Sequence, residues 1–190
     1  MRAPGLIALV AAAMAALSPP FAAATPLWQV DPERSVIVFG YALNLRPAQG
    51  AFRRVAGEGA FDPAAPEATR LTLEIDVTSL DLGDPVETAF ALSVDWFDAE
   101  NHPTARYRLA QLTALGGDDY EALGDLTIKG RTRVLRTPVT LTVGQREAQA
   151  RGALSFDRRD FGVGLGPSAL FVAIGADVSV RFDLVATAAD

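Results

Sequence analysis

The stretch LTLEIDVT at residues 71–78 alternates an apolar with a polar side chain at every position. Successive side chains of a β-strand point to opposite faces, so this period of two predicts a strand that buries one face and exposes the other. The stretch VSVRFDL at residues 178–184 repeats the pattern near the C-terminus. Half-buried strands of this kind are typical of antiparallel sheets, because parallel sheets are usually covered on both faces.

Six further segments carry a weaker alternation: residues 35–41, 55–61, 105–115, 120–128, 134–143 and 148–156. Turn signals such as Asp62-Pro63 and Lys129-Gly130 separate them. Eight antiparallel strands on one short chain favour closure into a barrel, because closure removes the exposed sheet edges. The sequence therefore predicts an all-β fold, an eight-stranded antiparallel β-barrel.

One helix is expected in the longest interval between strands. Asp84 is a good N-cap, Pro85 suits the first helical position, and Glu87 follows the cap by three residues. These residues predict a short helix over about residues 85–94. Because it interrupts the succession of strands, we expect it near a barrel end, where it either covers a mouth or plugs the interior.

The N-terminus has the composition of a secretory signal. Arg2 is followed by an apolar run at residues 5–17 and by small residues before Thr25. We expect residues 1–24 to form a cleaved signal peptide, which leaves residues 25–190 as a single domain. The alternative is a retained membrane anchor, but the apolar run is shorter than the roughly 20 residues that cross a bilayer.

Composition argues against several classes of function. The chain has no cysteine and a single histidine, which argues against a metal site and against a catalytic triad. The net charge is −6, and it becomes −7 when Arg2 is removed with the signal. An acidic protein lacks the basic face that nucleic acid requires, and anionic lipid surfaces do not attract it. We therefore expect a protein that is not an enzyme and binds neither nucleic acid nor metal.

Five groups of motifs occur in an order that resembles the YceI-like family. They are WQVDPERS (28–35) with Val38-Phe39, GAF (50–52) with GEGAFD (57–62), DWFD (95–98) with HPTARY (102–107), GDLTIKG (124–130), and RRDFGV (158–163). They are spread over about residues 26–186. One departure is that many members carry a histidine shortly after the first-strand phenylalanine, whereas here Phe39 is followed by Gly40-Tyr41-Ala42-Leu43. A headgroup contact by that histidine is therefore not expected.

The resemblance implies a lipocalin-like barrel that is exported to the bacterial periplasm and encloses a polyisoprenoid, an isoprenoid quinone or a similar long amphiphile. No cofactor is required, although a bound isoprenoid lipid or quinone is expected as cargo. The segment from Arg159 to Gly164, with the glycine-rich loop that follows, is similar to that of members associated with cytochrome b561. The alternative function is therefore that of an accessory or stress-response partner of a cytochrome b561-like membrane protein, acting through its outer surface. The sequence leaves open whether the chain forms a homodimer.

Apolar and aromatic side chains on the expected inner faces are the candidate ligand-binding residues. They are Phe39, Tyr41, Leu43, Phe52, Leu73, Ile75, Phe90, Trp96, Phe97, Tyr107, Leu126, Ile128 and Phe161. For each of them, packing in a filled core is the alternative. Gly57, Gly59 and Gly152 leave space where a filled core would prefer bulk, although strand glycines also mark bends at barrel corners.

One cation is the candidate for contact with a headgroup. Arg158 and its neighbour Arg159 border a glycine-rich loop at residues 162–166, where a guanidinium could meet a phosphate or carbonyl group. The alternative is that the two arginines form ion pairs with Asp157 or Asp160 at the barrel rim.

Overall fold

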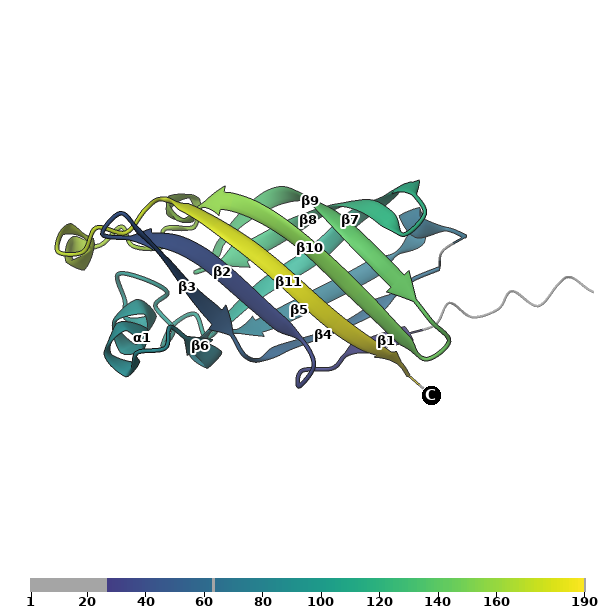
Figure 1. The fold of residues 1–190 in the computed structure, drawn as a ribbon, viewed down its shortest axis with the longest axis horizontal. Helices are drawn as coiled ribbons and strands as arrows, with labels where there is room; N and C mark the ends of the chain where they lie inside the picture. The colour runs from purple at the N-terminus through teal and green to yellow at the C-terminus, as the bar shows by residue number, and fades with distance from the viewer. Residues whose placement is uncertain (1–26, 63, 190) are drawn as a thin grey trace, which may run out of the picture.

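The computed structural model describes residues 27–189 except residue 63. In this part of the chain, eleven strands wrap around a common axis (Figure 1). The strands are β1 (Leu27–Val30), β2 (Val36–Leu43), β3 (Arg46–Phe52), β4 (Val55–Ala60), β5 (Arg70–Asp76), β6 (Leu80–Asp81), β7 (Thr104–Gly116), β8 (Asp119–Ile128), β9 (Arg131–Val143), β10 (Glu147–Asp157) and β11 (Asp177–Ala188). The helices are α1 (Pro85–Leu92) and the short 3₁₀ helices η1 (Pro66–Ala68), η2 (Val77–Ser79), η3 (Arg158–Phe161) and η4 (Pro167–Leu170). None of these described helices is long and apolar enough to cross a membrane.

The sheet closes on itself. Its strands follow the order β1-β4-β5-β7-β8-β9-β10-β11, and β11 pairs back onto β1, so eight antiparallel strands complete a ring. Beyond this ring, β2, β3 and β6 continue the sheet from β11. The eight-stranded antiparallel barrel with one short helix is therefore confirmed. The expected signal peptide, residues 1–24, lies outside the described residues.

Two of the long strands of the wall are broken into halves. β1 and β2 both pair with β11, β1 against residues 186–188 and β2 against residues 179–183. β3 and β4 are related in the same way, since β3 pairs with β2 and β4 pairs with β1. The sequence pattern does not predict β1, β3 or β6, because each is short or carries no regular alternation.

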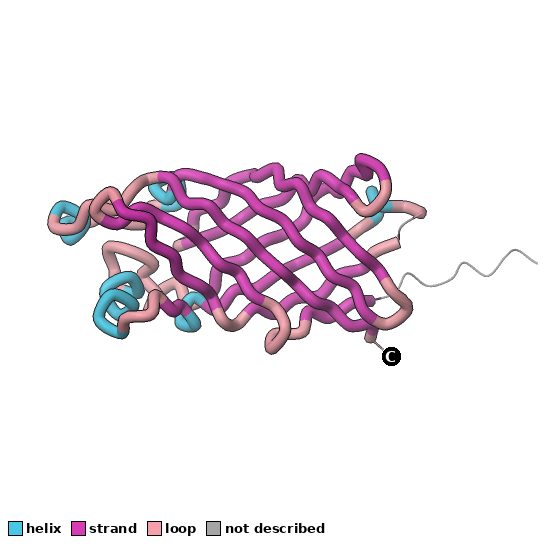
Figure 2. The backbone as a smooth tube through the Cα atoms, in the orientation of Figure 1, coloured by secondary structure: helices cyan, strands magenta, loops and turns pink. Residues whose placement is uncertain are grey.

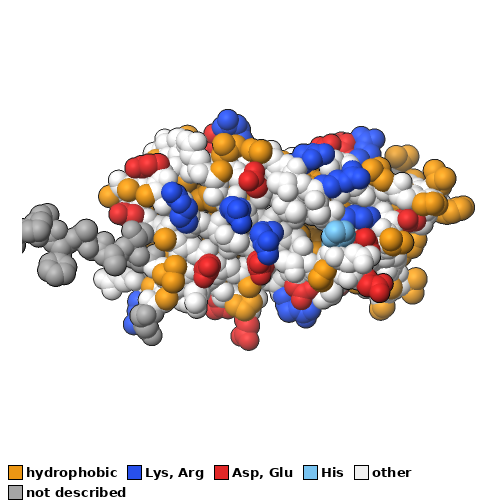
Figure 3. All heavy atoms as spheres, turned by 180° about the vertical axis from the view of Figure 1, so that it is seen from behind, with side chains coloured by type: hydrophobic (Ala, Val, Ile, Leu, Met, Phe, Trp, Pro, Cys, Tyr) orange, Lys and Arg blue, Asp and Glu red, His pale blue; other side chains and the backbone are white. Residues whose placement is uncertain are grey.

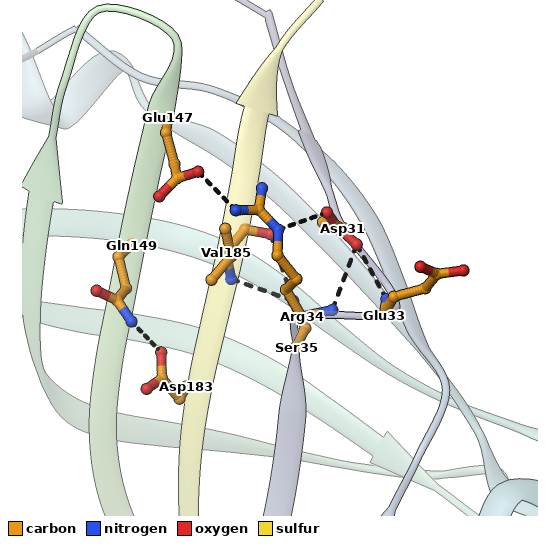
Figure 4. Close-up of polar contacts among 8 residues, drawn as sticks. All are labelled: Asp31, Glu33, Arg34, Ser35, Glu147, Gln149, Asp183 and Val185. Carbon is orange, nitrogen blue, oxygen red and sulfur yellow. Dashed lines mark hydrogen bonds and ion pairs between the residues drawn. The ribbon is translucent and has the colours of Figure 1, made fainter.

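A buried serine fills the break between β1 and β2. The Ser35 hydroxyl accepts a hydrogen bond from the Val185 amide at 3.1 Å and donates to the Val185 carbonyl at 3.3 Å (Figure 4). Beside it, Arg34 joins Asp31 to Glu147 of β10, at 2.7 Å from each carboxylate. Side chains therefore replace the backbone ladder where the strand is interrupted, so the polar groups at the break keep their partners.

Ser79 has the same role at the break between β3 and β4. Its hydroxyl accepts hydrogen bonds from the amides of Arg53 and Arg54 at 3.1 and 3.0 Å, and it donates to the carbonyl oxygen of Asp76 at 2.6 Å. Both breaks let the wall bend without leaving buried amides unpaired.

The helix α1 lies at one end of the barrel, the same end as η4 (Figure 2). Asp84 accepts hydrogen bonds from the amides of Val86 and Glu87 at 2.7 and 3.0 Å, as expected of an N-cap. The helix ends at Leu92, two residues before the predicted boundary, because the amide of Ser93 turns back to the carbonyl of Phe90. No side chain of α1 is buried. The helix therefore covers the barrel end and does not plug it.

The buried apolar side chains form three clusters along the barrel. Trp28 and Tyr120 belong to the cluster farthest from α1, and Val55 to the middle one. Trp96 and Phe161 belong to the cluster nearest α1. The clusters pack against the wall and leave the centre of the barrel open.

Candidate functional site

A cavity of about 610 Å³ runs through the barrel interior. Every strand except β6 contributes to its wall. Along β11 the wall consists of Val178, Val180, Phe182, Leu184 and Ala186, the apolar positions of the alternating pattern. The alternation in the sequence therefore builds a continuous apolar wall. The enclosed volume lies within the range of small-molecule sites, about 300–1,000 Å³.

Polar side chains reach the cavity mainly near its two ends. Tyr41, Asn44 and Glu87 line it at the α1 end, and Thr69 and Arg70 line it at the opposite end. Burial raises the pKa of the Tyr41 hydroxyl above its ordinary value, with a smaller contribution from Glu87. Among the described residues, no cluster of three or more His, Cys, Asp or Glu side chains is placed to hold a metal ion.

The structure brings almost all of the sequence-predicted site residues together. Thirteen of the fourteen candidates line the cavity: Phe39, Tyr41, Leu43, Phe52, Leu73, Ile75, Phe90, Trp96, Phe97, Tyr107, Leu126, Ile128 and Arg158. Nine of them lie on β2, β3, β5, β7 and β8, where the register of the sheet sets the inward face, and four lie on α1, the connection after it and η3. That these residues contact a ligand is a proposal, taken up below.

Phe161 is the candidate that does not line the cavity. Its side chain is fully buried and packs against Phe156, with 5.1 Å between the ring centroids, in a cluster with Trp96. Phe161 belongs to η3 and not to a strand, so the period of two could not place its face. This corrects its expected position: Phe161 supports the wall behind Trp96.

Arg158 lines the cavity, but backbone oxygens occupy its guanidinium. It donates to four loop carbonyls at 2.6 to 3.0 Å: those of Val163, Gly164, Ile174 and Gly175. Its Cζ atom also lies 5.2 Å from the centre of the Trp96 ring. Burial lowers the pKa of Arg158, yet an arginine stays protonated in proteins and offers five N–H donors. With four donors used, at most one is left for a headgroup.

Arg159 makes the ion pair that the sequence left open. Its Nε atom lies 2.9 and 3.0 Å from the two carboxylate oxygens of Asp157. This contact lowers the pKa of Asp157 to about 2. The two neighbouring arginines therefore differ: Arg159 is paired at the surface, and Arg158 fastens the loop at residues 162–176.

Two inward-facing glycines provide room for aromatic rings of neighbouring strands. A Cβ atom at Gly124 would stand 2.4 Å from the ring of Tyr107, and one at Gly152 would stand 2.4 Å from the ring of Phe182. Gly59, by contrast, lines the cavity itself. These contacts let large rings lie against the wall and not across the space. The space expected at Gly152 is thus covered by the Phe182 ring, which the sequence could not indicate because that ring comes from a different strand.

Three buried polar atoms have no protein partner among the described residues: Nε1 of Trp28, Oγ1 of Thr69 and the hydroxyl of Tyr107. All three residues line the cavity. An unpartnered buried polar group costs about 1–3 kcal/mol. The Tyr107 hydroxyl lies against Gly124 of the barrel wall and is buried there. No local pattern in the sequence marks them, because their isolation depends on what surrounds them in the folded barrel.

Tyr107 is expected to keep its proton to high pH. Burial raises the pKa of its hydroxyl from 10.0 to about 12, with a smaller contribution from Asp125. The unfolded chain ionises near pH 10, so the folded state loses stability as the pH rises from about 10 to 12, and the effect is absent below this window. Phenolate absorbance of the native protein should show an ionisation step near pH 12, and Tyr107→Phe should remove that step. Ionisation of all three tyrosines near pH 10 in the folded protein would contradict the prediction.

The closed barrel and its continuous apolar cavity define a lipocalin-like barrel, a class whose interior can hold one small ligand. Within this class the chain belongs to the YceI-like family, since the model of the YceI-like domain matches residues 28–186. A UPF0312 protein from Vibrio cholerae is 27% identical over 170 residues, which cover 82% of this chain and 87% of that protein. A UPF0312 protein from Azotobacter vinelandii is 27% identical over 131 residues, covering 63% of this chain and 66% of that protein.

Solved structures show the same fold. The crystal structure of BcnA from Burkholderia cenocepacia superposes with a TM-score of 0.76 at 31% identity and covers 82% of this chain and 98% of that chain. A polyisoprenoid binding domain from Saccharophagus degradans, implicated in plant cell wall breakdown, superposes with a TM-score of 0.71 at 17% identity. That match covers 85% of this chain and 98% of the other, and it concerns the fold alone.

Proposed function

We propose that this protein encloses a long apolar amphiphile, such as a polyisoprenoid or an isoprenoid quinone, and acts as a carrier without catalysing a reaction. The observation that carries the proposal is the apolar cavity of about 610 Å³, which extends from Trp28 to the α1 end. The fold shared with a polyisoprenoid binding domain from Saccharophagus degradans supports this class of ligand.

The energetics suit such a ligand. Burial of one CH₂ group contributes about 0.8 kcal/mol, so a five-carbon isoprenoid unit contributes at most about 4 kcal/mol. The loss of translational and rotational freedom on association costs about 4–15 kcal/mol. Two or three enclosed units therefore offset much of this cost through apolar contact alone. A deep, dry wall is sufficient, and specific polar chemistry is needed only to orient the headgroup.

At the α1 end of the cavity the polar groups favour a neutral headgroup over a phosphate, whereas Arg70 lines the opposite end. At the α1 end, Arg158 has at most one N–H donor to offer, and the Glu87 carboxylate lines the same cavity. An anionic group there would lack a free cation and would meet a like charge. The Tyr41 hydroxyl and the Asn44 amide, which line the same end, are neutral donors suited to a carbonyl oxygen. These contacts support a quinone-like ligand.

The direct experiment identifies the bound molecule. The chain from residue 25, purified from a bacterial periplasm without detergent, should carry a lipid that native mass spectrometry detects and organic extraction identifies. After delipidation it should bind an isoprenoid quinone at least about tenfold more tightly than an isoprenyl phosphate of equal length, a difference of about 1.4 kcal/mol. Tighter binding of the phosphate would refute the neutral headgroup. Preparations that are consistently empty and bind neither molecule would refute the carrier function.

The proposed place of action is the periplasm. The support for it is the composition of residues 1–24, which matches a cleaved secretory signal. The alternative function is that of an accessory or stress-response partner of a cytochrome b561-like membrane protein that acts through its outer surface, which the motif at residues 159–164 supports. Sequencing of the exported protein should find Thr25 at its N-terminus, whereas a retained segment would point to an anchor.

A further inference from the structure

A patch of exposed apolar side chains lies at the α1 end of the barrel. Leu45 is 94% exposed, Leu170 and Phe171 are each 87% exposed, and Val86 of α1 is 78% exposed. Figure 3 shows hydrophobic side chains gathered at this end of the molecule, whereas charged side chains spread over the barrel wall. We call these four residues the apolar tip. Most exposed apolar side chains in soluble proteins are scattered singly, so a cluster of fully exposed ones at one end points to a contact surface.

Backbone hydrogen bonds hold two loops of the apolar tip together. The amide of Asn44 donates to the carbonyl of Ala173 at 2.8 Å, and the amide of Gly175 donates to the carbonyl of Ala42 at 2.8 Å. The turn that carries Leu45 and the loop that carries Leu170 and Phe171 are therefore fastened to each other. These loops of the tip therefore form one ordered surface and do not move as independent loop ends.

Leu45 occupies a strained backbone position. Asn44 and Leu45 join β2 to β3 with φ angles of 50° and 64°, in the left-handed region. Such two-residue turns strongly prefer Asn-Gly, because glycine has no Cβ atom to clash. A leucine here is unfavourable for the backbone and, at 94% exposure, buries almost nothing in the fold. Because Leu45 stabilises neither the turn nor the core, we infer that its side chain contacts something outside the folded domain.

The loop of the apolar tip lacks charge altogether. The sixteen residues from Phe161 to Ala176 include no Asp, Glu, Lys, Arg or His, although charged residues make up 21% of the chain. Its one polar side chain, Ser168, is already occupied, since the hydroxyl accepts from the Trp96 indole at 3.2 Å and the amide donates to Asp95 at 2.8 Å. A protein interface normally has a rim of hydrogen-bonding groups, and this loop offers few.

The apolar tip is continuous with the cavity. Leu43, Asn44, Val172 and Ile174, which adjoin the tip in the chain, line the cavity, and so does Val86 itself. An amphiphile that enters or leaves at this end would pass directly beside the exposed side chains. Apolar side chains thus extend from the interior of the barrel to the outer surface, beside the polar side chains of Asn44 and Glu87.

From these features we propose that the apolar tip inserts into the interface of an uncharged lipid bilayer and places the cavity mouth against the membrane. Protruding apolar side chains partition into the boundary between headgroups and acyl chains. The charged residues beside the tip in the chain, Arg46, Asp84 and Glu87, together with Asp95, which accepts from the Ser168 amide, carry one positive and three negative charges, so anionic lipids are not attracted. The transfer of cargo at this surface rests on the proposed carrier function, whereas the docking itself does not.

Vesicle flotation tests the docking. The chain from residue 25 should float with phosphatidylcholine vesicles, and high salt should not release it. Leu170→Ser combined with Phe171→Ser should reduce the bound fraction at equal lipid by at least about tenfold, because two apolar side chains no longer leave water. The matched control is Leu115→Ser, since Leu115 is 65% exposed in the hairpin at the opposite barrel end. It should float like the unmodified protein, and circular dichroism should show that all variants fold.

Three results would overturn the docking proposal: no flotation of the unmodified protein, equal flotation of the serine pair, or binding that needs phosphatidylglycerol and is lost in high salt. The first result would assign the tip to a protein partner. Ala150→Trp, which narrows the cavity far from the tip, should float normally even though it should hold no ligand. Loss of cargo with intact flotation thus concerns only the carrier function, and loss of flotation with intact cargo concerns only the docking.

Discussion

Ala150→Trp is expected to weaken ligand binding at least about a hundredfold, about 2.7 kcal/mol, while the protein still folds. Ala150 lies on the inner face of β10, opposite Leu184 of β11 and Leu141 of β9, and lines the middle of the cavity. An indole at this position would occupy the space that the apolar chain of a ligand needs. Titration of delipidated protein with an isoprenoid quinone measures the loss.

The stability of Ala150→Trp decides whether the barrel is hollow. If the centre is open, the new side chain gains apolar contacts, and the free energy of unfolding should not decrease. If the core is filled, overpacking should instead cost about 1–3 kcal/mol. The matched control is Ala153→Trp, which adds the same indole to an exposed position of the same strand. Urea denaturation compares the two variants. Unchanged binding by Ala150→Trp, or reduced binding by Ala153→Trp, would contradict a central site.

The sequence predicts the barrel because buried apolar and exposed polar side chains alternate along its strands with a period of two. In β5, the apolar positions Leu71, Leu73 and Ile75 all face the cavity, as the alternation requires. β3 escapes prediction because its sequence, RPAQGAF, contains Pro47 and small residues with no alternation. It becomes a strand only because β2 and β6 supply partners on both sides. Pairing across the sheet, and not local propensity, determines such a strand.

The site is predictable where it follows the strand pattern and not where it depends on loops. Nine of the thirteen candidates that line the cavity lie on strands, where the register sets the inward face, whereas Phe90, Trp96, Phe97 and Arg158 lie on α1, the connection after it and η3. The function of Arg158 could not be predicted, because its four carbonyl partners come from a loop that is irregular in sequence and folds back over η3. The unpartnered hydroxyl of Tyr107 likewise depends on its full three-dimensional surroundings. Local sequence indicates a side chain's face, but not the atoms it will meet.

Arg158→Met is expected to lower the free energy of unfolding by about 2–4 kcal/mol, because it removes four charge-assisted hydrogen bonds at once and leaves their acceptors with water or with nothing. Methionine keeps the unbranched length of the side chain, so the packing against Trp96 is largely preserved. Arg158→Lys should restore little, since an ammonium cannot reproduce the planar set of donors that reaches Val163, Gly164, Ile174 and Gly175. Urea denaturation measures both losses.

Arg159→Met is the matched control, because it removes the neighbouring arginine, whose partner Asp157 lies at the surface. An exposed ion pair contributes little in water, so this variant should unfold close to the unmodified protein. Hydrogen exchange should locate the difference: in Arg158→Met the amides of residues 162–176 should exchange faster while those of β11 stay protected. If Arg158 serves the ligand and not the loop, its replacement should leave loop exchange and stability unchanged and reduce only binding. If the amides of residues 162–176 exchange faster in delipidated Arg158→Met than in the delipidated unmodified protein, Arg158 holds the loop in place even without a ligand. Arg158 then stabilises the mouth through which the cargo passes.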